Sequence, residues 1–309
     1  FFLKVLICIG GPTASGKTKL AIELALTLGC EIISFDSRQV YRELNIGVAK
    51  PSIEELNAVR HHFIDHTSII EPFNAAKFEN EAITLLDSLF VDRDYMVAVG
   101  GTGLYINALL NGLDDIPDIS SATESYIEEQ YAEKGIAWLQ NFILQNDSSY
   151  SQIADMNNPM RLLRASKIIH SSGKKYSDYR VGVPKKRNFS TLNYYLNPDR
   201  NQLYDKINQR VDVMMDKGLL EEVKGLMEYK SLKPLMTVGY SELFEHLDGV
   251  TGLEEAISKI KQNTRRYAKR QFTWFKNQGT WHPLNPDTLE QIIQSIIKDI
   301  NDVEVHTKY

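Results

Sequence analysis

Hydrophobic residues occur at two spacings along this chain, and their order is the first indication of its fold. Short, mainly apolar runs cover residues 3–9, 31–35, 96–99 and 191–196, which is typical of strands buried on both faces of a parallel sheet. Between these runs, apolar residues recur every three to four positions, as they do along one side of a helix. The pattern predicts an α/β protein, a parallel sheet flanked by helices.

The alternation of strands and helices stops in one internal region. There, helical spacing predicts helices over 122–134, 136–145 and 159–171, with Gly173 ending the last. We therefore expect a smaller all-helical insertion domain at 117–189, set within a core formed by 1–116 and 190–309.

Other apolar residues at helical spacing predict the remaining elements of the core. We expect one helix directly after residue 18 and a short strand near Trp281. Further helices are expected over 52–59, 73–91, 200–217, 221–229, 253–277 and 286–300.

The turn after the first apolar run carries a recognisable chemistry. It reads Gly-Pro-Thr-Ala-Ser-Gly-Lys-Thr and matches the phosphate-loop pattern G-x-x-x-x-G-K-[ST] at every fixed position. In such a loop, backbone N–H groups and the positive end of the following helix dipole surround an anion. Lys17 would supply a mobile charge and Thr18 a hydroxyl suited to Mg²⁺. The expected phosphate or diphosphate site is Gly11, Pro12, Thr13, Ala14, Ser15, Gly16, Lys17 and Thr18.

Two further polar turns follow strands of the same predicted sheet. Asp36 ends the second apolar run; it could bind Mg²⁺ through water, accept a proton from a nucleophile, or cap a helix. The run at 96–99 ends in a second glycine turn that contains Thr102. Ligands of open α/β sheets bind at the carboxyl ends of the strands, so we expect both side chains to lie beside the phosphate loop.

Histidines and cysteines are few and give no strong metal or disulfide signal. His61 and His62 are adjacent, so they cannot share one face of a regular helix or strand, and we favour structural histidines near a strand over a zinc site. Cys8 and Cys30 are too few for a disulfide framework, which predicts reduced, buried thiols in a cytoplasmic protein. No apolar run approaches the roughly 20 residues that span a bilayer.

Charge is unevenly distributed along the chain. The net charge is −5, yet residues 259–276 hold seven basic and no acidic residues, and residues 174–187 hold six basic residues against Asp178. Two basic clusters on an acidic protein suggest a polyanionic partner laid against a specific surface. The alternative from charge alone is a solvated helix face.

A series of short motifs runs through nearly the whole chain. They are Gly11-Pro-Thr-Ala-Ser-Gly-Lys-Thr18, Asp36-Ser37 with Tyr41, Ile46-Gly-Val-Ala-Lys-Pro51, His61-His62, Gly100-Gly-Thr-Gly-Leu-Tyr105, Pro159-Met-Arg-Leu-Leu-Arg-Ala165, Ile207-Asn-Gln-Arg-Val-Asp-Val-Met214 with Gly218, Val238-Gly-Tyr240, and Thr264-Arg-Arg-Tyr-Ala-Lys-Arg-Gln271 with Trp274. In content and order they resemble the tRNA dimethylallyltransferase family, with two departures: Met160 stands where a polar residue is usual, and Lys206 where arginine is common.

The resemblance implies a P-loop NTPase-like fold and transfer of a dimethylallyl group from dimethylallyl diphosphate to N6 of the adenosine just 3′ of a tRNA anticodon. The phosphate loop would hold a leaving diphosphate, with Lys17, Arg210 and Thr18-bound Mg²⁺ neutralising its charge. Asp36 would act as the base and Thr102 would orient the amine. The target adenine would have to leave the stacked anticodon loop.

The resemblance also implies that the insertion and the basic helix grip the anticodon stem-loop. We expect a monomer, with tRNA and dimethylallyl diphosphate as its partners. The expected tRNA contacts are Asp36, Ser37, Arg38, Gln39, Thr102, Met160, Arg161, Leu162, Leu163, Arg164, Arg265, Arg266, Lys269 and Arg270.

Three other functions compete with tRNA prenylation. A small-molecule kinase would use the same loop and Mg²⁺, with Arg161 or Arg164 as lid groups. A non-catalytic, nucleotide-switched RNA-binding module would show nucleotide-dependent RNA affinity without product. A transferase acting on free adenine nucleotide would not need the basic helix or so large an insertion.

Overall fold

The computed structural model describes residues 4–285 and 288–307, and side chains up to residue 302. The chain divides into two compact units, one formed by residues 1–110 and 186–309 and the other by Asn111–Lys185. Leu3, at the start of the first predicted strand, and residues 286–287, at the start of the predicted C-terminal helix, lie outside the described residues.

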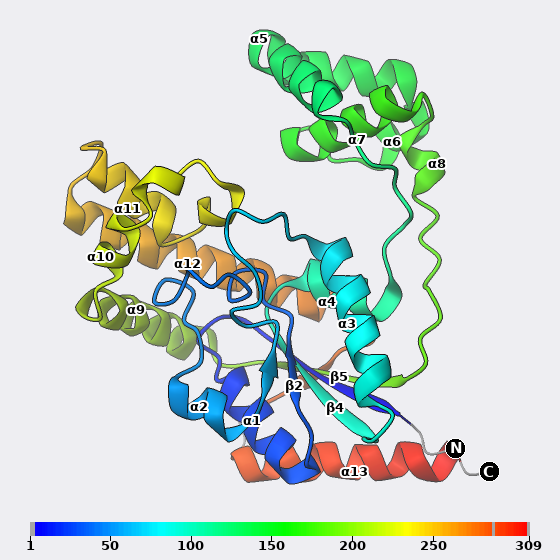
Figure 1. Ribbon diagram of the computed structural model, residues 1–309, viewed down its shortest axis with the longest axis vertical. Helices are drawn as coiled ribbons and strands as arrows, with labels where there is room; N and C mark the ends of the chain where they lie inside the picture. The colour runs from blue at the N-terminus through cyan, green and yellow to red at the C-terminus, as the bar shows by residue number, and fades with distance from the viewer. Residues whose placement is uncertain (1–3, 286–287, 308–309) are drawn as a thin grey trace. The chain divides into compact units, whose positions relative to one another are not determined.

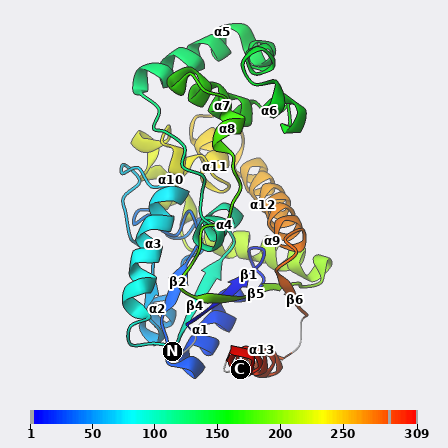
Figure 2. The same ribbon diagram turned by 90° about the vertical axis from the view of Figure 1, so that its right-hand side faces the viewer.

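The first unit is built on a six-stranded sheet in which every described strand pair is parallel, which confirms the expected fold class (Figures 1 and 2). The strand order is β3-β2-β4-β1-β5-β6. The central strand β1 is buried along its whole length, as its unbroken apolar sequence requires. The strands are β1 (Val5–Gly10), β2 (Ile32–Ser34), β3 (His61–His62), β4 (Tyr95–Gly100), β5 (Ser190–Leu196) and β6 (His282–Leu284).

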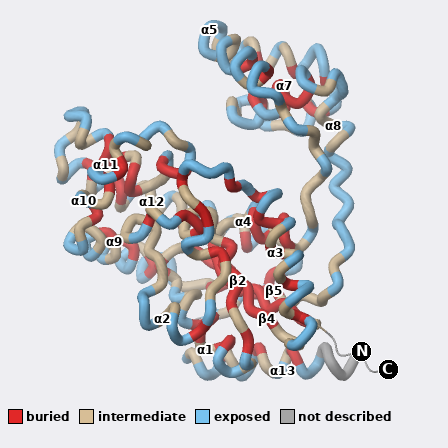
Figure 3. The backbone as a smooth tube through the Cα atoms, in the orientation of Figure 1, coloured by how far each residue is buried: buried red, intermediate tan, exposed pale blue. Residues whose placement is uncertain are grey.

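Helices flank this sheet, and the buried residues of the unit follow its central strands (Figure 3). The long helix α12 packs against α9 and α11. The helices are α1 (Lys17–Leu28), α2 (Ile53–Ala58), α3 (Ala75–Leu89), α4 (Gly103–Asn111), α9 (Arg200–Asp216), α10 (Leu219–Lys224), α11 (Tyr240–Leu247), α12 (Leu253–Lys276) and α13 (Leu289–Thr307), with short 3₁₀ turns η1 (Met227–Tyr229) and η2 (Lys233–Leu235).

The second unit is all-helical in its described elements. It contains α5 (Ser121–Asn146), α6 (Ser148–Ile153), α7 (Pro159–Ser172) and α8 (Tyr176–Tyr179). Gly135 has φ 68° and interrupts α5, at the boundary between the two helices expected there. Gly173 ends α7 in the left-handed conformation that glycine favours.

The prediction of a single helix over 221–229 is wrong. The structure has α10 followed by the separate turn η1, because the helical hydrogen bonding stops at Gly225, a residue with low helix propensity. Helix α11 was not predicted. It has eight residues, which gives too few turns for a clear apolar period.

The histidines of β3 make structural contacts. The ring of His62 bonds through Nε2 to Glu31 Oε2 at 2.6 Å, and His61 Nδ1 lies 2.7 Å from the Val59 carbonyl. Burial lowers the pKa of His61, and its Nε2 has no partner among the described residues. Among the described residues, no group of three or more His, Cys, Asp or Glu side chains could hold a metal ion. None of the described helices is long and apolar enough to cross a membrane.

Candidate active site

Three polar turns meet at the carboxyl edge of the sheet. The phosphate loop follows β1, the Asp36 turn follows β2, and the turn carrying Thr102 follows β4. Strands β1 and β4 are neighbours in register, with Gly10 opposite Gly100. The hydroxyl of Thr102 accepts a hydrogen bond from the Ser37 N–H at 3.0 Å. The phosphate loop, Asp36 and Thr102, which are far apart in the sequence, therefore form one site.

The phosphate loop has the backbone conformation needed to surround an anion. Gly11 and Gly16 have φ values of 146° and 90°, and Ala14 also lies in the left-handed region at 63°. The Lys17 ammonium group donates to the Pro12 carbonyl at 3.1 Å. Burial lowers the pKa of Lys17 to about 8, while Asp36 opposes this shift and Arg210 adds to it. The loop thus holds a cation that an arriving anion would stabilise.

Ser15 gives independent support for an anion site. Its hydroxyl is buried and has no hydrogen-bond partner among the described residues, and buried polar groups are rarely left unpaired without a reason. Apart from its chain neighbours and the local helix backbone, no heavy atom lies within 4 Å of the position where a side chain on Gly16 would begin. A phosphate oxygen held by the loop could accept a hydrogen bond from the Ser15 hydroxyl.

Arg210 reaches the same loop from α9. Its Nη1 donates to the Thr13 hydroxyl at 3.4 Å, and burial lowers the pKa of its guanidinium. Ala14 packs with Ile207 of α9 and Ala268 of α12 in a small apolar cluster. Helix α9 therefore supports the loop and places the Arg210 cation beside it.

The two carboxylate oxygens of Asp36 have different surroundings. Its Oδ1 accepts from the N–H groups of Arg38 and Gln39, at 2.9 and 3.3 Å, and so shapes the turn. Its Oδ2 has no hydrogen bond within the described part of the chain. No helix begins here, because the next one, α2, starts at Ile53 with Ser52 as its N-cap, so the interpretation of Asp36 as a helix cap is wrong. The Oδ2 atom remains available to a proton or to a water molecule.

Helix α12 covers this edge with residues whose roles were not predicted from the sequence. The Gln271 side chain accepts from the Thr13 N–H at 2.9 Å and donates to the Gly101 carbonyl at 3.0 Å. Tyr267 lies near Thr102 and Asp36, and burial followed by the Asp36 carboxylate raises its pKa to about 12. A polar residue on the buried side of an amphipathic helix, as at position 271, was the available sequence signal.

The donors that could hold Mg²⁺ are the Thr18 hydroxyl and, through water, Asp36. Mg²⁺ usually retains several waters and binds through one or two protein ligands together with substrate phosphates. The Thr18 hydroxyl and the Asp36 carboxylate, beside a loop suited to phosphate, match this mode of coordination. The residues present are therefore compatible with Mg²⁺.

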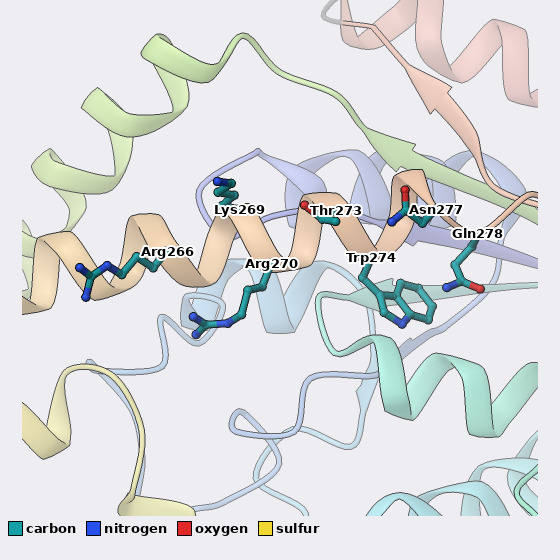
Figure 4. A pocket seen from close by; sticks show the side chains of 7 residues that line it. All are labelled: Arg266, Lys269, Arg270, Thr273, Trp274, Asn277 and Gln278. Atoms are coloured by element: carbon teal, nitrogen blue, oxygen red, sulfur yellow. The ribbon is translucent and has the colours of Figure 1, made fainter. Parts of the chain in front are cut away.

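The expected tRNA-binding cations of α12 are not equivalent. Arg265 is half-buried and donates to the Asn208 side chain at 2.6 Å. Arg266, Lys269 and Arg270 are exposed and line a groove of about 600 Å³. Figure 4 shows Arg270 and Trp274 on one side of α12 and Lys269 on the other. The other residues lining the groove are Thr273, Asn277 and Gln278.

In the second unit, helix α7 separates the expected tRNA contacts into two groups. Met160, Arg161 and Arg164 are exposed, whereas Leu162 and Leu163 belong to the apolar core of the unit. The alternation follows helical spacing, because neighbours in sequence point about 100° apart. The side chains of Leu162 and Leu163 are therefore not available to contact tRNA. They can only support the surface formed by the three exposed residues.

Comparison with known proteins places this chain in a family. The family model described as IPP transferase matches residues 39–278, which is more than half of the chain. The chain belongs to the IPP transferase family. It is 45% identical over 302 residues to the tRNA dimethylallyltransferase of Flavobacterium psychrophilum, covering 95% of this chain and 98% of that protein. It is 47% identical over 271 residues to that of Christiangramia forsetii, covering 88% and 90%.

Solved structures of the family agree with the fold. The tRNA isopentenylpyrophosphate transferase of Bacillus halodurans has a TM-score of 0.72 and 35% identity, covering 99% of this chain and 98% of that one. A eukaryotic dimethylallyltransferase described as acting on tRNA has a TM-score of 0.79 and 27% identity, covering 93% and 75%.

Proposed function

We propose that this protein transfers a dimethylallyl group from dimethylallyl diphosphate to the exocyclic N6 of the adenosine just 3′ of the anticodon in tRNA. In this reaction the C–O bond to the diphosphate breaks, the C–N6 bond forms, and N6 loses one proton. One observation carries the proposal. An anion loop, a carboxylate with one available oxygen and a threonine hydroxyl occupy the same sheet edge, beneath a helix with exposed cations. Membership of the IPP transferase family supports it.

The donor half of the site is the phosphate loop. The leaving diphosphate gains negative charge as the C–O bond breaks, so cations fixed beside it lower the barrier. Lys17 and Arg210 supply two such charges, and the Ser15 hydroxyl adds a hydrogen bond. Mg²⁺ held by Thr18 would supply further charge neutralisation when bound.

The acceptor half is formed by Asp36 and Thr102. An aromatic amine is a weak nucleophile, so removing its proton as the new bond forms assists the reaction. The Oδ2 atom of Asp36 is suited to accept that proton, while the hydrogen bonds to Oδ1 hold the carboxylate in place. Thr102 is suited to orient the amine. An adenine paired or stacked within the loop could not reach these groups, so it must flip outward.

The tRNA itself would be held mainly through its backbone. Exposed Arg266, Lys269 and Arg270 match the charge of RNA phosphates, and Trp274 in the same groove offers a face on which an unstacked base can stack. On the second unit, Arg161 and Arg164 offer the same chemistry.

One assay tests this proposal against the kinase alternative. The protein is incubated with Mg²⁺, labelled dimethylallyl diphosphate and unmodified tRNA, and the tRNA is then digested and searched for prenylated adenosine. Label in the adenosine fraction is expected. ATP hydrolysis stimulated by a small hydroxylated metabolite, with no label in tRNA, would replace the proposal with a kinase.

A further inference from the structure

The two halves of the site are connected by one buried side chain. Gln271 lies on α12 and is only 6% exposed. Its carbonyl oxygen accepts from the Thr13 N–H of the phosphate loop, and its amide nitrogen donates to the Gly101 carbonyl, next to Thr102. An amide that offers one acceptor and one donor in opposite directions fits these two partners. Both ends of the side chain are therefore engaged in fixing loops rather than in binding ligand.

The packing around Gln271 leaves little freedom for either loop. A Cβ atom added to Gly101 would lie 2.1 Å from the Gln271 amide nitrogen, so a side chain at position 101 would displace this amide from its hydrogen bond. On the far side, the hydroxyl of Thr13 accepts a hydrogen bond from Arg210. A continuous series of contacts thus runs from a cation of the donor half, through Thr13 and Gln271, to the turn that carries Thr102.

We propose that Gln271 is a positioning residue that sets the distance between the phosphate loop and the Thr102 turn, so that the allylic carbon and the adenosine amine meet in line. This inference rests on the proposed function. The loops hold different substrates, and a displacement of about 1 Å between reacting groups can cost on the order of 100-fold in rate. Because both polar ends of Gln271 are bonded to the backbone of the two loops, its loss should reduce the chemical step more than either binding step.

Gln271→Met tests the proposal, since methionine keeps the length and volume of the side chain but cannot make either hydrogen bond. Single-turnover transfer at saturating substrates should fall about 10- to 100-fold. The dissociation constants for tRNA and dimethylallyl diphosphate should change less than about threefold. Gln262→Met, on the exposed side of the same helix, is the matched control and should behave as wild type. Equal losses in binding and turnover, or an unchanged rate, would overturn the proposal.

Gln271→Glu separates positioning from simple loss of packing. A protonated carboxyl group offers one acceptor and one donor, as the amide does, whereas the ionised form cannot donate to the Gly101 carbonyl. Burial raises the pKa of a carboxyl group, so the activity of this variant relative to wild type should rise as the pH falls from about 8 to about 6. A ratio that does not change with pH contradicts the proposed donor and acceptor roles.

The two proposals fail in different ways. If wild-type protein yields no prenylated adenosine, the proposed function is wrong. If wild type and Gln262→Met are active and Gln271→Met matches them while its melting temperature is unchanged, the function stands and the positioning role is refuted.

Discussion

Raising the pH should weaken the binding of dimethylallyl diphosphate through a single group, Lys17. Burial lowers the pKa of this ammonium to about 8 in the free protein, so the group is about 90% charged at about pH 7 and about 10% charged at about pH 9. A bound diphosphate stabilises the charged form and raises the pKa again. If only the charged form binds well, the apparent dissociation constant should increase about tenfold between these two pH values.

Calorimetric titration with dimethylallyl diphosphate, repeated in buffers of different ionisation enthalpy, measures this linkage directly. Binding should take up about 0.9 proton at about pH 9 and about 0.1 at about pH 7. The folding stability of the free protein should change in the opposite direction to the binding affinity and increase with pH. Because the pKa is lower in the folded state than in the unfolded chain, the unfolded state binds more protons above about pH 8, and this group's contribution to the free energy of unfolding increases with pH.

Lys17→Met is the control, since it removes the titrating group while keeping most of the side-chain length. Its binding should be weaker and should lose the tenfold pH dependence. The reasoning is refuted if the variant retains the wild-type proton uptake, or if wild-type affinity is constant between about pH 7 and pH 9.

Three further predictions concern other parts of the site. Asp36→Asn should lower turnover by roughly 10²–10⁴ with little change in tRNA affinity; rescue by added Mg²⁺ would instead indicate that Asp36 mainly orders the ion. Single Ala substitutions of Arg266, Lys269 and Arg270 should each weaken tRNA binding and reduce its salt dependence by up to about one charge, measured by filter binding, and unchanged slopes would exclude phosphate contacts. Leu162→Ala should destabilise the helical unit by about 2–5 kcal/mol, seen as a lower melting temperature, and an unchanged melting temperature would contradict its core position.

Local sequence patterns predicted the sheet and much of the site. The phosphate loop, Asp36 and Thr102 each follow an apolar run directly, so the rule that ligands lie at the carboxyl ends of parallel strands was enough to bring them together. The break at Gly135 was likewise visible from the pattern of helices around it. These features depend on residues close in sequence, and local physical preferences specify them.

Features set by distant residues could not be predicted in this way. The partner of Gln271 in the Gly101 turn is 170 positions away, and no local pattern encodes such a contact. Leu162 and Leu163 were expected to contact tRNA with their neighbours, yet the packing of α5 against α7 places both in the core. The sequence does not distinguish Arg265 from the three exposed cations of α12. Its hydrogen bond to Asn208 depends on how α9 and α12 pack, which no local pattern specifies.

The pairing of β1 with both β4 and β5 has a consequence for synthesis on the ribosome. Strand β4 ends at Gly100, but β5, which pairs with the other edge of β1, begins only at Ser190. A nascent chain that has emerged as far as the end of the helical unit carries a complete phosphate loop, yet the opposite edge of β1 is open and α12 does not yet exist. Exposed apolar strand edges favour misassociation. Ribosome-bound chains halted before residue 190 should therefore depend on chaperones more than chains halted after residue 285.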